Sequence, residues 1–222
     1  MAVSFTDLAQ TCAPAIPIET LAAVVSLESQ FQPFGIRVGG SSSLHEQPKS
    51  KAEAIETATA LMAEHQDVQL GLGGIGIAEL RKFDLSIADA FDPCLNLKAT
   101  ATLLDGYYRL AVRAGATLQQ AERVMLQSYY GRSDPSVGKM AQYDDQVQGE
   151  AKRLSKTLSA IAIEQSVGRP TVPEPQISDP SLNVGERPLP ERSTKPPSWD
   201  VFHAARQSSA LVFQNDQPEQ SE

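Results

Sequence analysis

One carboxylate stands at the end of a strongly apolar helical segment. Leu21, Val24 and Val25 lie seven, four and three residues before Glu28, and these positions share one face of a helix with 3.6 residues per turn. Because such a face is buried, we expect Glu28 to be partly desolvated, which raises its pKa. A glutamic acid of this kind can donate a proton near neutral pH and then act as a base. The spacing is also typical of a helix-end glutamate that reaches solvent past Phe31, and it does not decide between the two.

The elements that must position this carboxylate are predicted to be mostly helical, because the apolar residues recur at intervals of three and four. The predicted helices cover residues 17–31, 51–65, 92–111, 117–129 and 137–163. Thr117 and Gln120 resemble a capping box, and a short hairpin is predicted after Pro33. The expected fold class is therefore α+β, mostly α, with a small β element.

The composition changes near residue 165. Nine of the fifteen prolines fall between Pro170 and Pro218, and proline breaks regular helix. We therefore predict a folded domain over residues 1–165 and a disordered, proline-rich tail over residues 166–222. Residues 198–213 interrupt this pattern with apolar side chains at helical spacing, which indicates either a short helix that docks on a partner or incidental hydrophobicity.

Several classes of function are disfavoured. A net charge of −8 argues against direct binding of nucleic acid. No apolar run reaches the roughly 18 residues that a membrane span needs. The N-terminus has no signal peptide of ordinary form, so a mature form, an unusual export route and an intracellular protein stay open. The three histidines lack metal-ligand spacing, so no metal or cofactor is expected. Cys12 and Cys94 are compatible with one disulfide or with two buried thiols.

A glycine-rich segment offers an alternative. Gly71-Leu-Gly-Gly-Ile-Gly76 fits the pattern Gly-x-Gly-x-x-Gly of dinucleotide sites. That pattern binds a nucleotide only within a βαβ unit, and here helical segments surround it. We prefer to interpret the segment as a flexible glycine-rich rim of a cleft.

Several segments follow one another in a characteristic order over roughly residues 8–135. They are Leu8-Ala-Gln-Thr-Cys-Ala-Pro, Ala22-Ala-Val-Val-Ser-Leu-Glu-Ser-Gln-Phe-Gln-Pro-Phe-Gly-Ile, Gln47-Pro, Glu53-Ala-Ile-Glu-Thr-Ala, Leu70-Gly-Leu, Ala90-Phe-Asp-Pro-Cys-Leu-Asn-Leu and Ser128-Tyr-Tyr-Gly. In this order and spacing they resemble the VirB-type lytic transglycosylases of type IV secretion and conjugal transfer systems.

The resemblance implies a lysozyme-like fold and cleavage of the β-1,4 bond between N-acetylmuramic acid and N-acetylglucosamine in peptidoglycan. Glu28 would protonate the leaving oxygen and then take the proton of the C6 hydroxyl, which gives a 1,6-anhydro sugar without a second carboxylate. Tyr129 would pack near Glu28 and orient it by a hydrogen bond. The substrate-binding residues would be Ser29, Gly71, Leu72, Gly73, Gly74, Tyr129 and Tyr130.

The resemblance also implies partners and a location. The partners would be peptidoglycan glycan strands and other type IV secretion or conjugation proteins, the latter through the tail, and the location would be periplasmic. Cys12 and Cys94 both lie in matching segments, which favours a disulfide between the N-terminal segment and the start of the helix at residue 92.

The chain departs from the family pattern in two places. Gly74 stands where the family has Gln, and Gly76 stands where it has Asn. After the tyrosine pair the chain reads Gly131-Arg-Ser-Asp-Pro, where the family often has Ser/Thr-Gly-Asn. The alternative function is therefore a catalytically weakened or inactive lysozyme-fold scaffold that binds cell wall or secretion components.

Overall fold

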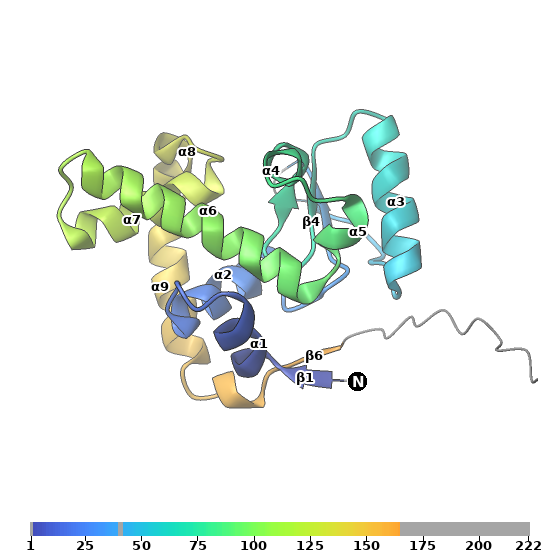
Figure 1. Cartoon of the computed structure of the whole chain (residues 1–222), viewed down its shortest axis with the longest axis horizontal. Coiled ribbons are helices and arrows are strands. Elements are labelled where there is room, and N and C mark those ends of the chain that lie inside the picture. Colours follow the sequence, from blue (N-terminus) through green and yellow to red (C-terminus); the bar gives the residue numbers. More distant parts are fainter. Residues whose placement is uncertain (1, 40–41, 165–222) are drawn as a thin grey trace, which may run out of the picture. The chain divides into compact units, whose positions relative to one another are not determined.

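The domain is built mainly of helices. The computed structural model describes residues 2–39 and 42–164, all within one structural unit. The helices are α1 (Phe5–Cys12), α2 (Ile18–Ser29), α3 (Lys51–Ala63), α4 (Ile77–Lys82), α5 (Ile87–Ala90), α6 (Pro93–Arg113), α7 (Leu118–Tyr130), α8 (Pro135–Met140) and α9 (Tyr143–Leu154), and Figure 1 shows their arrangement. The predicted α+β class with mostly helix is confirmed. The predicted tail at residues 166–222, with its segment at residues 198–213, lies outside the described residues and stays a prediction.

A small antiparallel sheet forms one side of the domain. Its strands are β2 (Ile36–Val38), β3 (Ser42–Ser43), β4 (Val68–Leu70) and β5 (Ile75–Gly76), in the order β3-β2-β4-β5. Arg37 lies opposite Gln69, and their neighbours Ile36 and Leu70 are paired and fully buried. Because side chains alternate along a strand, the sheet packs one face into the core and presents Arg37 and Gln69 on the other. The hairpin predicted after Pro33 is thus part of a larger sheet.

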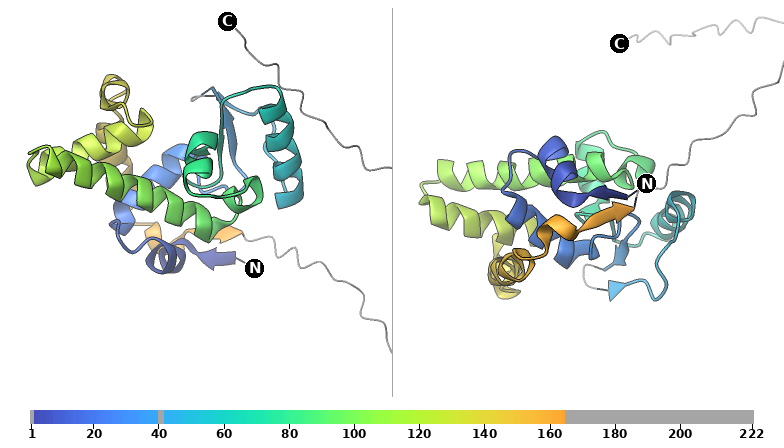
Figure 2. Two further views of the ribbon diagram at one scale, coloured as in Figure 1. Left: turned by 45° about the horizontal axis from the view of Figure 1, so that its top comes forward. Right: turned by 90° about the horizontal axis from the view of Figure 1, so that it is seen from below.

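Two further strands join the ends of the domain. β1 (Ala2–Ser4) pairs antiparallel with β6 (Ala162–Glu164), and Val3 lies opposite Ile163. The second view in Figure 2 shows the two strands side by side. This pairing fixes the segment that leads into α1.

Helix α2 is the centre of the larger core. Five consecutive residues, from Leu21 to Val25, have no solvent exposure, so the helix is buried all round rather than on a single face. It packs against α1 and α9 and shares its core with residues of α6 and α7. A helix held on all sides places its last turn, which carries Glu28, in a fixed position.

Helix α6 connects the two cores. Leu97, Ala101 and Leu104 belong to the core around α2, whereas Ala99 and Leu103 belong to the core between the sheet and helices α3 and α5. These two sets lie on different faces because of the 3.6-residue period. The long helix therefore packs against both the helical part of the domain and the part that contains the sheet, as Figure 1 shows.

The positions of several helices were predicted correctly from short sequence patterns, mainly from capping residues. The helix predicted over residues 51–65 is α3. Asp92 caps α6 by accepting a hydrogen bond from Leu95 N at 2.9 Å. Thr117 and Gln120 form the predicted capping box of α7. Each signal depends only on residues within one turn of helix.

The long helix predicted over residues 137–163 is wrong. The chain breaks at Gln142, which has a φ of 52°, and forms α8, α9, a 3-10 turn (Leu158–Ala160) and β6 instead. The break leaves Met140 78% exposed and turns Tyr143 into the core at 2% exposed. Burial of the tyrosine and pairing of β6 with β1 are tertiary effects that outweigh the helical period of the segment.

The N-terminal helix was not predicted, although Phe5, Leu8, Ala9 and Cys12 are buried at helical spacing on α1. A disulfide joins Cys12 to Cys94 at the start of α6, with 5.3 Å between the two Cα atoms. The bond implied by the resemblance is therefore present, and it ties α1 to the helix that both cores share.

Candidate active site

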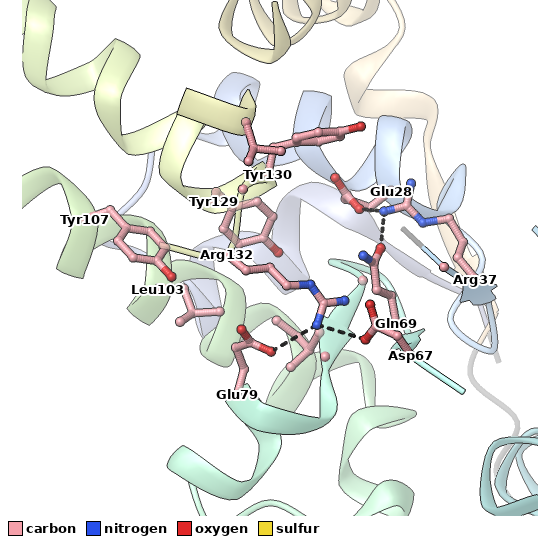
Figure 3. A pocket seen from close by; sticks show the side chains of 16 residues that line it. Glu28, Arg37, Asp67, Gln69, Glu79, Leu103, Tyr107, Tyr129, Tyr130 and Arg132 are labelled. Atoms are coloured by element: carbon pink, nitrogen blue, oxygen red, sulfur yellow. Dashed lines mark hydrogen bonds and ion pairs between the residues drawn. The ribbon is translucent and has the colours of Figure 1, made fainter. Parts of the chain in front are cut away.

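Glu28 lies at the end of α2, at the bottom of a pocket between the sheet and the helical part of the domain. Its side chain is only 5% exposed. Arg37, Gln69 and Gly74 form the wall on the side of the sheet. Figure 3 shows the side chains of Arg37 and Gln69 beside Glu28. The opposite wall comes from Tyr107 of α6, from Tyr129 and Tyr130 of α7, and from Arg132.

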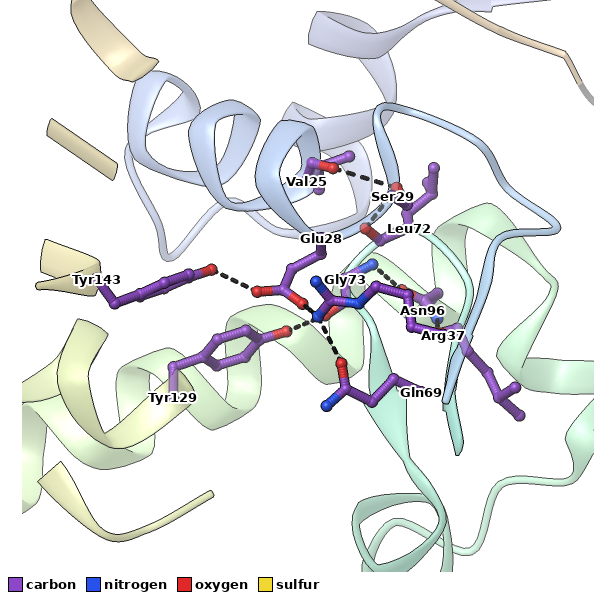
Figure 4. A network of polar contacts seen from close by, with 11 residues as sticks. Val25, Glu28, Ser29, Arg37, Gln69, Leu72, Gly73, Asn96, Tyr129 and Tyr143 are labelled. Carbon is purple, nitrogen blue, oxygen red and sulfur yellow. Dashed lines mark hydrogen bonds and ion pairs between the residues drawn. The ribbon is translucent and has the colours of Figure 1, made fainter. Parts of the chain in front are cut away.

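Both carboxylate oxygens of Glu28 have hydrogen-bond donors. The hydroxyl of Tyr143 donates to Oε1 at 2.6 Å. Nη2 of Arg37 donates to Oε2 and also to Oε1 of Gln69. Figure 4 shows this network around the carboxylate. The side chain is therefore held in one orientation by groups from β2 and α9.

Burial determines the acidity of this group. Removal of the carboxyl from water raises the pKa of Glu28, and the ion pair with Arg37, the hydrogen bond from Tyr143 and the charge of Arg132 oppose this effect without cancelling it. Burial also raises the pKa of Tyr143, which stays a neutral donor. Glu28 is therefore an acid that can hold its proton at a higher pH than an exposed glutamate.

Tyr129 has a different role from the one expected. Its hydroxyl donates to the backbone oxygen of Gly73 at 2.5 Å, not to Glu28. The expectation that Tyr129 orients Glu28 by a hydrogen bond is wrong, because Tyr143 occupies that place. Tyr129 does line the pocket beside Glu28, so its predicted position is correct.

The glycine-rich segment is a tight turn between two antiparallel strands. Gly71 and Gly74 have φ values of 73° and 64°, which favour glycine. The side chain of Asn96, 1% exposed, accepts from Gly73 N at 2.8 Å and donates to the carbonyl oxygens of Leu70 and Ala90 at 3.0 and 2.8 Å. A dinucleotide site needs parallel strands joined by a helix, whereas β4 and β5 pair antiparallel.

The structure brings some predicted substrate-binding residues to the pocket and not others. Gly74, Tyr129 and Tyr130 line it together with Glu28. The hydroxyl of Ser29 instead donates to Leu72 O at 2.8 Å. The remaining predicted residues, Gly71, Leu72 and Gly73, are buried behind the pocket, where they fix the turn that carries Gly74.

Sequence reasoning missed the partners of Glu28. Arg37 stands between two apolar residues of a strand, and this alternation is a signal for a charged side chain on the open face of a sheet. Tyr143 is 115 residues from Glu28 in the sequence and sits after an unpredicted break, so no local signal marks it. Arg132 was seen only as a departure from the family pattern.

No group of three or more His, Cys, Asp or Glu side chains is placed to hold a metal ion in the part of the chain that the structure describes. Over the same residues, no helix is long and apolar enough to cross a membrane.

Comparison with curated proteins gives the relatives of this chain. It is 41% identical over 129 residues to the proteins named Type IV secretion system protein virB1 of Brucella abortus and Brucella melitensis, a match that covers 58% of this chain and 54% of theirs. Over these residues the chain is similar to VirB1 proteins. It is also 28% identical over 160 residues to Protein virB1 of Agrobacterium fabrum, which covers 70% of this chain and 62% of that protein.

The chain spans about half the length of the Brucella VirB1 proteins that it matches. No protein-family model and no solved structure matches it. The resemblance of the sequence motifs to VirB-type proteins is thus supported by VirB1 relatives.

Proposed function

We propose that this protein is a peptidoglycan lytic transglycosylase that cleaves the β-1,4 bond between N-acetylmuramic acid and N-acetylglucosamine. The observation that carries the proposal is Glu28, a carboxyl with a raised pKa, buried at the bottom of a pocket and held by Tyr143 and Arg37. General acid catalysis on a glycosidic oxygen requires a protonated acid of this kind.

The proposed reaction needs one carboxyl and no water. Glu28 donates its proton to the leaving oxygen as the bond to the muramic acid C1 breaks. The resulting carboxylate takes the proton of the C6 hydroxyl, whose oxygen forms the new bond to C1, and Glu28 is protonated again. The hydroxyl of Tyr143, which donates to Oε1 of Glu28, stabilises the carboxylate between the two steps.

Two other carboxylates line the pocket. Asp67 and Glu79 lie 3.3 and 3.8 Å from Nη1 of Arg132, and Figure 3 shows both side chains directed at this guanidinium. A retaining glycosidase uses its second carboxylate as a free nucleophile about 5–5.5 Å from the acid. The pairing with Arg132 therefore favours the single-carboxyl reaction.

The names of the relatives support a setting for this activity. Because those relatives are called type IV secretion system proteins, we place the proposed cleavage in the periplasm, where it opens the wall locally for a secretion or conjugal transfer apparatus. The partners would then be glycan strands and other components of that apparatus.

Purified sacculi test the proposal. Incubation with the full chain should release muropeptides that end in 1,6-anhydromuramic acid, identified by mass spectrometry. Glu28→Gln should release none, whereas Glu46→Gln, at a carboxylate whose side chain is 78% exposed, should behave as the wild type. Release by Glu28→Gln at the wild-type rate would contradict the proposal.

A second candidate is a scaffold that binds glycan without cleaving it. The ion pair between Arg37 and Glu28 favours it, because a carboxylate held by a guanidinium is stabilised in its charged form. A scaffold would sediment with sacculi, release no anhydro product and bind equally well after Glu28→Gln.

A further inference from the structure

Two glycines of the pocket wall leave room for two arginines. A Cβ atom at Gly74 would lie 2.8 Å from Oε2 of Glu28 and 3.4 Å from Nη2 of Arg37. A Cβ atom at Gly76 would meet Nη1 of Arg132. The guanidinium groups thus occupy the space into which side chains at positions 74 and 76 would extend.

The fold holds both arginines at the pocket. Arg37 comes from the exposed face of β2, with its side chain 17% exposed. Arg132 follows α7 with a φ of 49°, and its amide donates to Tyr129 O at 3.3 Å. This turn directs the Arg132 side chain, 30% exposed, across the pocket toward Gly76. Figure 3 shows both guanidinium groups pointing into the same space.

Each guanidinium has one buried N–H donor that makes no hydrogen bond to the described residues. Nε of Arg37 and Nη2 of Arg132 are buried and have no acceptor among the described residues. A buried donor without an acceptor is unfavourable, because it has lost its hydrogen bond to water. A carboxylate accepts two parallel N–H bonds from one guanidinium, so an anionic ligand is the chemical group that these donors match.

The positive charge of Arg37 is neutralised by the carboxylate of Glu28. Among the residues that the structure describes, Glu28 is the acid that pairs with Arg37. Protonation of Glu28, which its role as an acid requires, leaves the guanidinium without an anionic partner. The other titratable groups facing Glu28 are Arg132, which is positive, and Tyr129 and Tyr143, which are neutral. A carboxylate on the ligand would then neutralise the positive charge of Arg37.

We propose that Arg37 and Arg132 recognise a carboxylate on the glycan, and that Arg37 releases Glu28 to bind this carboxylate when the glycan enters the pocket. The proposal rests on the proposed function, because N-acetylmuramic acid carries a lactyl carboxyl that N-acetylglucosamine lacks. This carboxyl is free only where no stem peptide is attached to it, so the ligand of the two arginines is glycan from which the stem peptides have been removed. It makes Arg37 a specificity-determining residue and a positioning residue for Glu28. It also gives a role to Gly74, Gly76 and Arg132, which lie in the segments where the sequence departs from the expected family pattern.

Binding to two matched sugars tests the recognition. The probes are the tetrasaccharide of alternating N-acetylglucosamine and N-acetylmuramic acid with free lactyl carboxyls, and the neutral tetrasaccharide of N-acetylglucosamine. By titration calorimetry the full chain should bind the anionic sugar about 10-fold to 100-fold more tightly, as expected for a charge-assisted hydrogen bond. Arg37→Gln and Arg132→Gln should each reduce this preference at least about fivefold.

The control is Arg109→Gln on α6, whose guanidinium pairs with Asp105 at 2.9 Å and is 66% exposed. It should keep the wild-type preference. Circular dichroism of each variant checks that it is folded, and the use of two pocket variants keeps the test valid if one is not. No preference in the wild type, no binding of either sugar, or an unchanged preference in both pocket variants would overturn the proposal.

The pKa of Glu28 tests whether Arg37 exchanges Glu28 for the ligand carboxylate. A purely structural role of Arg37 would not change this pKa when ligand binds. In ¹³C NMR of the Glu28 carboxyl, the anionic sugar should raise the pKa of Glu28 and the neutral sugar should not, because only the anion withdraws Arg37. Arg37→Gln should raise it without ligand, and Arg37→Lys should restore part of the wild-type value. A Glu28 pKa that responds equally to both sugars would overturn the exchange.

Mass spectrometry of the recovered sugars separates this inference from the proposed function. Anhydro products without a preference for the anionic sugar would leave the function standing and refute the inference. A preference without products would support recognition and refute cleavage.

Discussion

Loss of the disulfide between Cys12 and Cys94 should destabilise the domain strongly. The bond closes a loop with a sequence separation of 82, which contains α2, the four-stranded sheet and α3 to α5. Glu28 and the wall of the pocket on the side of the sheet lie within this loop. Replacement of both cysteines by serine frees the loop in the unfolded chain and leaves the native packing largely intact.

The magnitude follows from the entropy of closing the loop. For a loop of this length the chain-entropy estimate is about 4.5 kcal/mol at 25 °C. For a domain of this size, 1 kcal/mol corresponds to about 3 °C in Tm, so the expected decrease is about 13 °C.

Urea unfolding followed by circular dichroism measures the effect. The oxidised wild type, the wild type with reductant, and Cys12→Ser/Cys94→Ser should be compared at one pH. The last two should agree, and reductant should not affect the double variant. Since neither cysteine lines the pocket, the folded double variant should keep its activity below its Tm. A loss of stability below about 1 kcal/mol would refute the entropic argument.

Three further predictions concern the pocket and its support. Tyr143→Phe removes the 2.6 Å hydrogen bond to Glu28 and should lower kcat about 10-fold or more with little change in KM; an unchanged kcat would show that the bond has no role in turnover. Asn96→Ala leaves three buried backbone groups unpaired and should cost about 3 kcal/mol or more in urea unfolding; a loss below about 1 kcal/mol would contradict it. Because burial raises the pKa of Glu28 above its ordinary value of 4.5, the folded state binds the proton more tightly, so the unfolding free energy should fall as pH rises above 4.5 through the folded pKa. Glu28→Gln should lack this decline, and parallel pH profiles for the two proteins would contradict it.

The parts of the fold that were predictable depend on short-range signals. The caps at Asp92 and Thr117 act within one turn, so the starts of α6 and α7 could be placed from the sequence. The break at Gln142 depends on the burial of Tyr143 against distant helices, and β6 exists only because β1 pairs with it. Neither leaves a local pattern that outweighs the helical spacing of the segment.

The site was predictable to a similar extent. The apolar residues that precede Glu28 on one helix face made its burial one of two possible interpretations, and the structure shows that Glu28 is buried. Tyr143 and Arg37 reach Glu28 from α9 and β2, and contacts between elements far apart in sequence have no marker in a single chain. The disulfide was inferred only from the resemblance, since two cysteines by themselves fit two free thiols equally well.

The central claim is that Glu28 cleaves the glycan with the C6 hydroxyl, and not water, as the nucleophile. Digestion of sacculi in H₂¹⁸O, followed by mass spectrometry of the released muropeptides, tests this most directly. The account predicts 1,6-anhydro products without ¹⁸O from the wild type and no products from Glu28→Gln. Reducing muramic acid ends that carry ¹⁸O would show hydrolysis by water and contradict it.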